Sequence, residues 1–197
     1  MKTACFTGHR KIPEELRPDV SIRLKRGIME AYSDGYRCFL CGGALGFDTL
    51  SALAVLDVKA ECPDIVLCLA LPCADQDAHW SDEDRRVYRE IRKNADREIV
   101  LSDRYYPGCM QMRNRYMVDH STLCICYWKE PGGGTAFTVR YAVRLGLDIV
   151  NLAMPEQTLR ENTCFCTFIS PSAVKNAVTA PLLPKSGRKH PPKKTSG

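Results

Sequence analysis

The sequence predicts a Rossmann-like, doubly wound α/β domain, with a mainly parallel sheet of about six or seven strands and helices on both faces. Two observations lead to this prediction. Short apolar runs alternate along the chain with segments of helical period, which implies right-handed crossovers and parallel strands. The runs are also continuously apolar, as IVLCLAL at 65–71 is, and this is typical of strands that are buried on both faces.

The runs rich in β-branched and aromatic residues are the predicted strands, and they cover 3–7, 37–41, 65–71, 98–101, 123–127 and 148–152. Apolar residues at helical spacing predict helices between them. Their stripes are Val20, Leu24, Ile28 and Ala31; Phe47, Leu50, Ala54 and Val58; Val87, Ile91 and Ala95; and Phe137, Tyr141 and Leu145. We expect Ser81, with Asp84 three residues on, to cap the third helix, and Gly35 and Gly146 to end the first and fourth.

The composition changes after residue 154. We expect residues 1–154 to form the Rossmann-like domain, 155–180 an extension that packs on or near it, and 181–197 a disordered, basic, Pro-rich tail. The net charge is +5, but five of the 28 basic residues lie between Pro181 and Gly197, which leaves 23 basic residues against 23 acidic ones. Because the rest of the chain is balanced, we do not expect nucleic acid as a partner.

The eleven cysteines do not indicate a disulfide scaffold, because their number is odd, no secretory signal precedes them, and most lie inside apolar runs. Reduced thiols without a signal predict a cytoplasmic protein. No apolar segment approaches the roughly 20 residues that span a bilayer, so we expect no membrane partner. The Cys and His spacings match no known ligand pattern, and we predict no metal site.

In folds of this class, ligands bind at the carboxyl ends of the strands, so the loops that follow the strands carry the functional prediction. The first strand runs into Gly8, His9 and Arg10. A glycine allows a ligand to approach the backbone closely, and the two basic side chains are hydrogen-bond donors. The alternative is a surface turn with two incidental basic residues.

Two glycine-rich loops lie directly between a predicted strand and a predicted helix. The first, which Asp48 follows, contains Gly42, Gly43, Ala44 and Gly46. The second, which Glu130 precedes, contains Gly132, Gly133, Gly134 and Thr135. Backbone amides at the N-terminus of a helix suit a phosphate or another anion. Each loop alone could be a tight connection, but two at one sheet edge predict a shared cleft for a phosphate-bearing ligand.

Two further segments could complete this cleft. Arg113, with Asn114 beside it, could clamp an anion, and Asp119 could accept a hydrogen bond from a ribose hydroxyl. Gln76 could contact the edge of a base and Trp80 could stack on it. The alternative is an amphipathic helix with solvated arginines and a tryptophan that is used in packing.

Five segments together resemble the SLOG superfamily, and in particular its YpsA-like branch. They are CFTGHR (5–10), GGALGFDTLSA (42–52), LPC-x-x-Q (71–76), GCMQMRNRYMVDHS (108–121) and PGGGTAFTVRYA (131–142). The resemblance covers residues 1–153 and keeps the order of the segments. It implies a Rossmann-like domain that binds nucleotides or nucleotide-derived small molecules, and it implies a homodimer or a higher homo-oligomer.

Members of this superfamily include the LOG phosphoribohydrolases, which release a base from a nucleotide monophosphate, and DprA, which binds single strands. LOG enzymes pair an R-K-x-x-M segment with a P-G-G-x-G-T-x-x-E loop, whose glutamate is required for cleavage. Arg113 and Met117 match this pattern, whereas Asn114 replaces the lysine and Thr138 replaces the glutamate. The resemblance therefore implies ligand binding rather than LOG-type cleavage.

We therefore predict a cytoplasmic protein that binds a nucleotide or a nucleotide-derived small molecule, in order to sense or sequester a signal, with no required cofactor. The first alternative is a phosphoribohydrolase-type enzyme that cleaves an N-glycosidic bond, with Asp48, Asp119 or Glu130 as the acid–base residue. The second alternative is a nucleic-acid or protein interaction module that acts through the basic tail.

Overall fold

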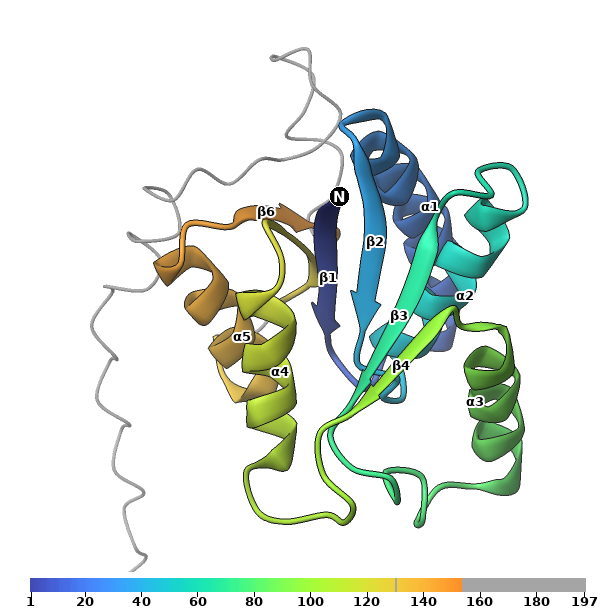
Figure 1. The fold of residues 1–197 in the computed structure, drawn as a ribbon, viewed down its shortest axis with the longest axis vertical. Coiled ribbons are helices and arrows are strands. Elements are labelled where there is room, and N and C mark those ends of the chain that lie inside the picture. Colours follow the sequence, from blue (N-terminus) through green and yellow to red (C-terminus); the bar gives the residue numbers. More distant parts are fainter. Residues whose placement is uncertain (130, 154–197) are drawn as a thin grey trace, which may run out of the picture.

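A single sheet of six parallel strands lies at the centre of the computed structural model, which describes residues 1–129 and 131–153. The order across the sheet is β4-β3-β2-β1-β5-β6, and Figure 1 shows β1 in its interior. The strands are β1 (Lys2–Gly8), β2 (Tyr36–Cys41), β3 (Val66–Leu71), β4 (Arg97–Val100), β5 (Leu123–Tyr127) and β6 (Asp148–Asn151). These bounds agree with the predicted strands to within one residue at each end, and the predicted fold class is confirmed.

Helices connect successive strands, as the alternating pattern predicts. They are η1 (Glu14–Leu16), α1 (Arg17–Ser33), α2 (Phe47–Lys59), α3 (Asp82–Asn94), α4 (Cys109–Asp119) and α5 (Gly133–Arg144). Ser81 caps α3 because its Oγ accepts a hydrogen bond from the backbone N–H of Asp84 at 3.1 Å. Gly35 and Gly146 follow α1 and α5 with φ angles of 90° and 80°, which confirms the two predicted helix ends.

The two faces of the sheet contribute to two separate hydrophobic cores. On one face, Phe6 and Phe39 pack with side chains of α1 and α2, such as Ile28. On the other face, Cys124 packs with Met117 of α4 and with side chains of α5. Figure 1 shows α1 and α2 on one side of the sheet and α4 and α5 on the other. The interior strands β1, β2, β3 and β5 are therefore buried on both faces over most of their length, which is why their sequences are largely apolar, whereas the edge strand β4 is mostly exposed.

Most cysteines of the described residues pack in these cores as small hydrophobic side chains, and Cys73 and Cys109 are buried outside them. All of these cysteines are free and buried: Cys5, Cys38, Cys41, Cys62, Cys68, Cys73, Cys109, Cys124 and Cys126. Burial raises the pKa of the Cys68 thiol to about 11, which keeps it protonated at neutral pH. Among the helices of the described residues, none is long and apolar enough to cross a membrane.

The predicted apolar stripe of α5 is wrong. Phe137 and Tyr141 are only partly buried and Leu145 is 49% exposed, whereas Ala136 and Val139 are fully buried. The small side chains face the sheet because they let the helix approach it closely. The two aromatic rings stack on each other instead, with their centroids 6.4 Å apart.

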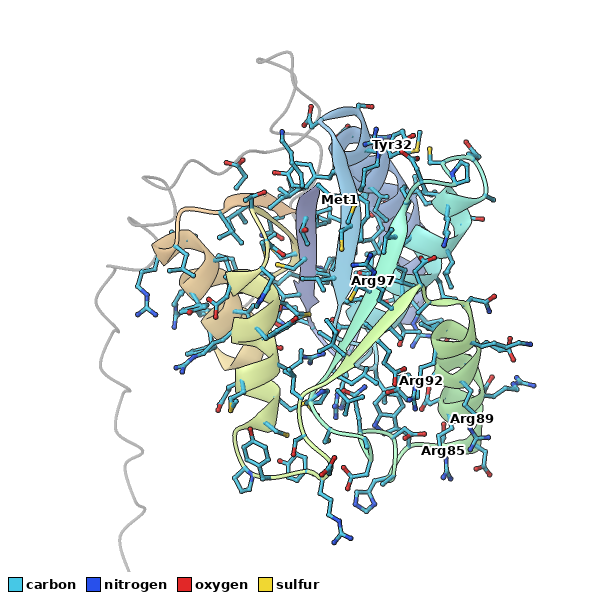
Figure 2. The ribbon with its side chains drawn as sticks, viewed as in Figure 1. Met1, Tyr32, Arg85, Arg89, Arg92 and Arg97 are labelled. Atoms are coloured by element: carbon cyan, nitrogen blue, oxygen red, sulfur yellow. The ribbon has the colours of Figure 1, made fainter. Side chains whose placement is uncertain are left out.

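The helix α3 carries a row of basic side chains on the outside of the molecule. Figure 2 shows Arg85, Arg89 and Arg92 along this helix, with Arg97 on the neighbouring edge strand β4. Arg92 forms an ion pair with Glu98 at 2.5 Å, and Arg85 forms one with Asp82 at 3.0 Å. Arg85 and Arg92 therefore belong to surface ion pairs.

The predicted extension at 155–180 and the predicted tail at 181–197 lie outside the described residues, and so does Glu130.

Candidate functional site

The order of the strands reverses between β1 and β5, and a pocket of about 300 Å³ lies at the carboxyl ends of these strands. Such a switch point is where open α/β sheets bind ligands, because the loops on its two sides diverge. The pocket is lined by the end of β1, the β2–α2 loop, the first turns of α2 and α5, and side chains along one side of α4. Its lining residues are Phe6, Thr7, Gly8, His9, Arg10, Ala44, Leu45, Asp48, Met110, Arg113, Asn114, Met117, Gly134 and Thr135.

The two predicted glycine loops reach this same pocket. Ala44 and Leu45 line it from the loop before α2, and Gly134 and Thr135 line it from the first turn of α5. His9 links the two sides, since its Nε2 accepts a hydrogen bond from the Lys129 N–H at 3.0 Å. The convergence of the loops is a consequence of parallel topology, which places every strand-to-helix loop at one edge of the sheet.

The glycines of the first loop make room for other groups of the site. A Cβ at Gly42 would lie 1.4 Å from Nη1 of Arg113, so the guanidinium occupies the space that any side chain there would need. Gly46 has a φ of +82°, and a Cβ there would lie 2.1 Å from the carbonyl oxygen of Arg10. Neither glycine lines the pocket, and both act by allowing Arg10 and Arg113 to approach.

A buried ion pair forms the floor of the pocket. Nη1 of Arg113 lies 3.4 Å from Oδ2 of Asp48, and the two residues are 5% and 6% exposed. The same oxygen accepts a hydrogen bond from the Ala44 N–H at 3.3 Å. Burial raises the pKa of Asp48, while the Arg113 charge, the Ala44 N–H and the Arg10 charge act in the opposite direction.

The guanidinium of Arg113 is only partly satisfied by this pair. Its Nε is buried and has no hydrogen-bond partner among residues 1–129 and 131–153. A guanidinium has five N–H donors, and leaving one of them buried without an acceptor costs free energy. An anion in the pocket would supply further negative charge and acceptor atoms beside this group.

The start of α5 adds backbone donors to the same wall. Its N-cap residue Gly132 makes no side-chain capping bond within the described structure, so the first N–H groups of the helix are available to a ligand. The helix dipole adds partial positive charge at this end. Behind this turn, Thr138 donates to the Gly134 carbonyl at 2.9 Å and accepts from Asn114 Nδ2 at 2.8 Å. The wall is therefore rich in donors for an anion.

Eight of the predicted site residues do not line the pocket: Gly42, Gly43, Gly46, Gln76, Trp80, Asp119, Gly132 and Gly133. Gln76 is buried, and its Nε2 donates to the Gly43 carbonyl at 2.8 Å. Trp80 packs on Tyr88, with the ring centroids 5.0 Å apart. Asp119 lies at the far end of α4, about 15 Å along the helix from its first residue, where it accepts from the Tyr141 hydroxyl at 2.7 Å.

Five lining residues were missed by the sequence reasoning: Phe6, Thr7, Leu45, Met110 and Met117. The signal for the methionines was present, because Met110 and Met117 lie three residues before and four residues after Arg113, on the same face of α4. They place apolar groups on either side of Arg113 along α4.

The fold and the pocket together define the class of protein. It is a Rossmann-like domain in which hydrogen-bond donors converge where the strand order reverses. Within this class, the chain belongs to the YspA SLOG family, whose model matches residues 18–146. It is similar to a UPF0398 protein of Staphylococcus haemolyticus, with 23% identity over 160 residues that cover 77% of this chain and 84% of the relative.

Two solved structures of DprA share the fold. The protein from Streptococcus pneumoniae has a TM-score of 0.56 at 15% identity, over 76% of this chain and 49% of that chain, so the match spans about half of its length. The protein from Helicobacter pylori has a TM-score of 0.53 at 18% identity, over 75% of this chain and 63% of that chain. At these identities the likeness concerns the fold.

These two structures correct the prediction that excluded nucleic acid as a partner. The Helicobacter pylori structure is described as showing that protein's single-stranded DNA binding mode. The prediction was wrong because it used the net charge of the chain, which does not say where basic groups lie. Residues 1–180 of this chain have 23 basic and 23 acidic residues, yet Arg10 and Arg113 both line the same pocket.

Proposed function

We propose that the pocket binds the phosphate of a nucleotide or a nucleotide-derived small molecule. The observation that carries this proposal is the buried guanidinium of Arg113, whose Nε has no partner within the described residues and which lies beside the open N-terminus of α5. A fixed guanidinium and free helix amides are the two groups that proteins most often use for phosphate.

The remaining walls suit the rest of a small nucleotide. Leu45 and Met110, which are half-buried, offer apolar surface to a sugar or a base, and the Asp48 carboxylate can accept from a hydroxyl group. A volume of about 300 Å³ is at the lower end of ligand pockets, which favours a single nucleotide unit over a dinucleotide. The biological output would be to sense or sequester this ligand.

Binding without cleavage is favoured by two residues that contact each other. Asn114 and Thr138 replace the lysine and the glutamate of the LOG pattern, and Asn114 Nδ2 donates to Thr138 Oγ1 at 2.8 Å. A neutral hydrogen-bonded pair therefore stands where the catalytic carboxylate of that pattern would be. A threonine hydroxyl cannot supply the charge that stabilises an oxocarbenium-like transition state.

Isothermal titration calorimetry of the full chain with AMP, ADP, a cyclic nucleotide, NAD and ribose 5-phosphate tests the proposal. We expect at least one ligand to bind with a Kd below about 1 mM, and we expect Arg113→Gln to weaken it about 10- to 100-fold. Arg89→Gln is the matched control, since Arg89 lies on the outside of α3 (Figure 2).

No binding by the wild-type chain, or an equal loss in the two variants, would contradict the proposal. A 5′-phosphorylated single-stranded oligonucleotide belongs in the same panel, because DprA shares this fold. If it competes with the mononucleotide for the same site, the ligand is the end of a strand.

A second candidate function is hydrolysis of the N-glycosidic bond by Asp48. The observation that favours it is that Asp48 lines the pocket while Asp119 does not, and that burial raises the pKa of Asp48 toward the range of a general acid. Release of free base from AMP, lost in Asp48→Asn but retained in Asp119→Asn, would support it. The absence of any base release would leave binding as the function.

A further inference from the structure

The Asp48–Arg113 pair is arranged so that a bound anion must disturb it. The contact is single and long, with 3.4 Å between Nη1 and Oδ2, and the pocket opens onto both side chains. The charged and titratable groups that face Asp48 are Arg113 of α4, Arg10 after β1 and the Cys41 thiol of β2, whose pKa is raised by burial. His9, which follows β1, lines the same pocket.

An oxyanion that binds to Arg113 places a second negative charge beside the Asp48 carboxylate. Asp48 is 6% exposed, so water compensates little of this repulsion. When two anions share a buried site, the pKa of one of them rises steeply. Asp48 already has a raised pKa in the free protein, and the guanidinium that partly offsets this rise is the group that the ligand engages.

We propose that the pocket takes up a proton together with each anion, and that Asp48 carries this proton. The inference rests on the proposed anion-binding function. Protonation removes the repulsion and gives the carboxyl group an O–H donor that can point to the anion. The Oδ2 atom can still accept from the Ala44 N–H, so the β2–α2 loop keeps its position. Anion affinity then falls as the pH rises.

Calorimetry of the full chain with sodium sulfate tests this inference, because sulfate does not change its protonation state between about pH 5 and pH 9. Titrations in pairs of buffers with different ionisation enthalpies give the number of protons taken up. We expect uptake to pass through a maximum above about 0.5 proton per sulfate, and to be near zero at the low pH where Asp48 is protonated before binding.

Two variants show which residue takes up the proton that accompanies sulfate binding. We expect Asp48→Asn to bind sulfate with no proton uptake and with an affinity that varies less than about twofold with pH. His9→Asn can bind sulfate more weakly because His9 lines the pocket, but it should take up the same number of protons per bound sulfate as the wild type. Uptake that persists in Asp48→Asn, or that disappears in His9→Asn, overturns the assignment to Asp48. If Asp48→Asn does not fold, the number of protons taken up by the wild type and by His9→Asn still shows whether a proton is taken up and whether His9 carries it.

The two proposals fail in different ways. Sulfate binding without any proton uptake in the wild-type chain overturns the inference and leaves the anion site intact. If neither sulfate nor any nucleotide of the panel binds, both the proposed function and the inference are overturned.

Discussion

Gly42 determines where the guanidinium of Arg113 can lie. Its missing side chain leaves the space that Nη1 occupies, and a Cβ there would also lie 2.6 Å from Oδ2 of Asp48. Both members of the buried pair therefore depend on this residue, although it is not among the residues that line the pocket. Gly42 is a positioning residue whose role could not be told from that of a phosphate-binding glycine in the sequence.

We expect Gly42→Ala to weaken nucleotide or sulfate binding by about 10-fold or more, because the added methyl group displaces Arg113. Gly27→Ala is the matched control. Gly27 lies within α1, and a Cβ there would meet Leu152 at an ordinary 3.8 Å. Titration calorimetry on both variants, with circular dichroism to check folding, measures the effect. Equal affinities for Gly42→Ala and the wild type would contradict this role.

At the scale of single residues, the sequence predicts polar groups at loop positions well and predicts their orientation poorly. His9 and Arg10 line the pocket because they follow β1, Thr135 because it opens α5, and Arg113 because it lies in the second turn of α4, near the end that faces the pocket. Asp119 belongs to the same predicted segment as Arg113, but a helix carries it to the opposite edge. Spacing along a helix shows which residues share a face, and it does not show which end of that face meets the ligand.

At the scale of elements, the strands were predictable and the buried face of α5 was not. Continuous apolar runs of four to seven residues can hardly be anything but buried strands when helical segments separate them. In α5 the aromatic residues Phe137 and Tyr141 formed the stronger stripe. The structure buries the other face, because the helix lies against the sheet through Ala136 and Val139. The two aromatic side chains instead pack with Arg115, whose guanidinium carbon lies 5.4 Å from the centroid of the Phe137 ring.

Asp96 joins three elements at the start of β4. It forms an ion pair with Lys59 of α2, and its Oδ2 accepts from the Leu67 N–H of β3 at 2.9 Å. Partial burial acts to raise the pKa of Asp96, but the bonds to Lys59 and to the Leu67 N–H outweigh it and lower the pKa. The stabilisation is therefore present above the unfolded-state pKa of about 4, and it is lost as the pH falls through the lowered folded-state value.

We expect Asp96→Asn to lower the free energy of unfolding by about 1 kcal/mol at pH 7. The difference from the wild type should shrink as the pH falls below about 4, because both proteins then carry a neutral group there. Urea denaturation at neutral and acidic pH measures it. Asp57→Asn breaks a more exposed ion pair with Lys25 and should change stability by less than about 0.5 kcal/mol. A difference that is the same at both pH values would rule out this linkage.

At the scale of the whole molecule, the pocket exists only when distant segments of the chain have come together. Asp48 and Arg113 are 65 residues apart. They meet because β1 lies between β2, which leads to Asp48, and β5, which follows the helix of Arg113, at the point where the strand order reverses. The hydrophobic cores on the two faces of the sheet hold these segments in place without contribution from the polar floor. The unfolded chain therefore has no equivalent site.

A ligand that binds only the folded chain must stabilise it. We expect saturating AMP, or sulfate if AMP does not bind, to raise the free energy of unfolding by about 2.7 kcal/mol at a concentration 100 times its Kd. The corresponding rise in melting temperature should be lost in Arg113→Gln and kept in Arg89→Gln. Differential scanning calorimetry at several ligand concentrations measures it, and a shift that is independent of Arg113 would place the ligand elsewhere.

Each wall of the pocket is supplied by a different loop or helix start, while the apolar layers that hold the molecule together lie on the flanks of the sheet. Substitutions in the lining can therefore accumulate during evolution at little cost to folding. One architecture can in this way diversify into catalysts, receptors and strand-binding proteins.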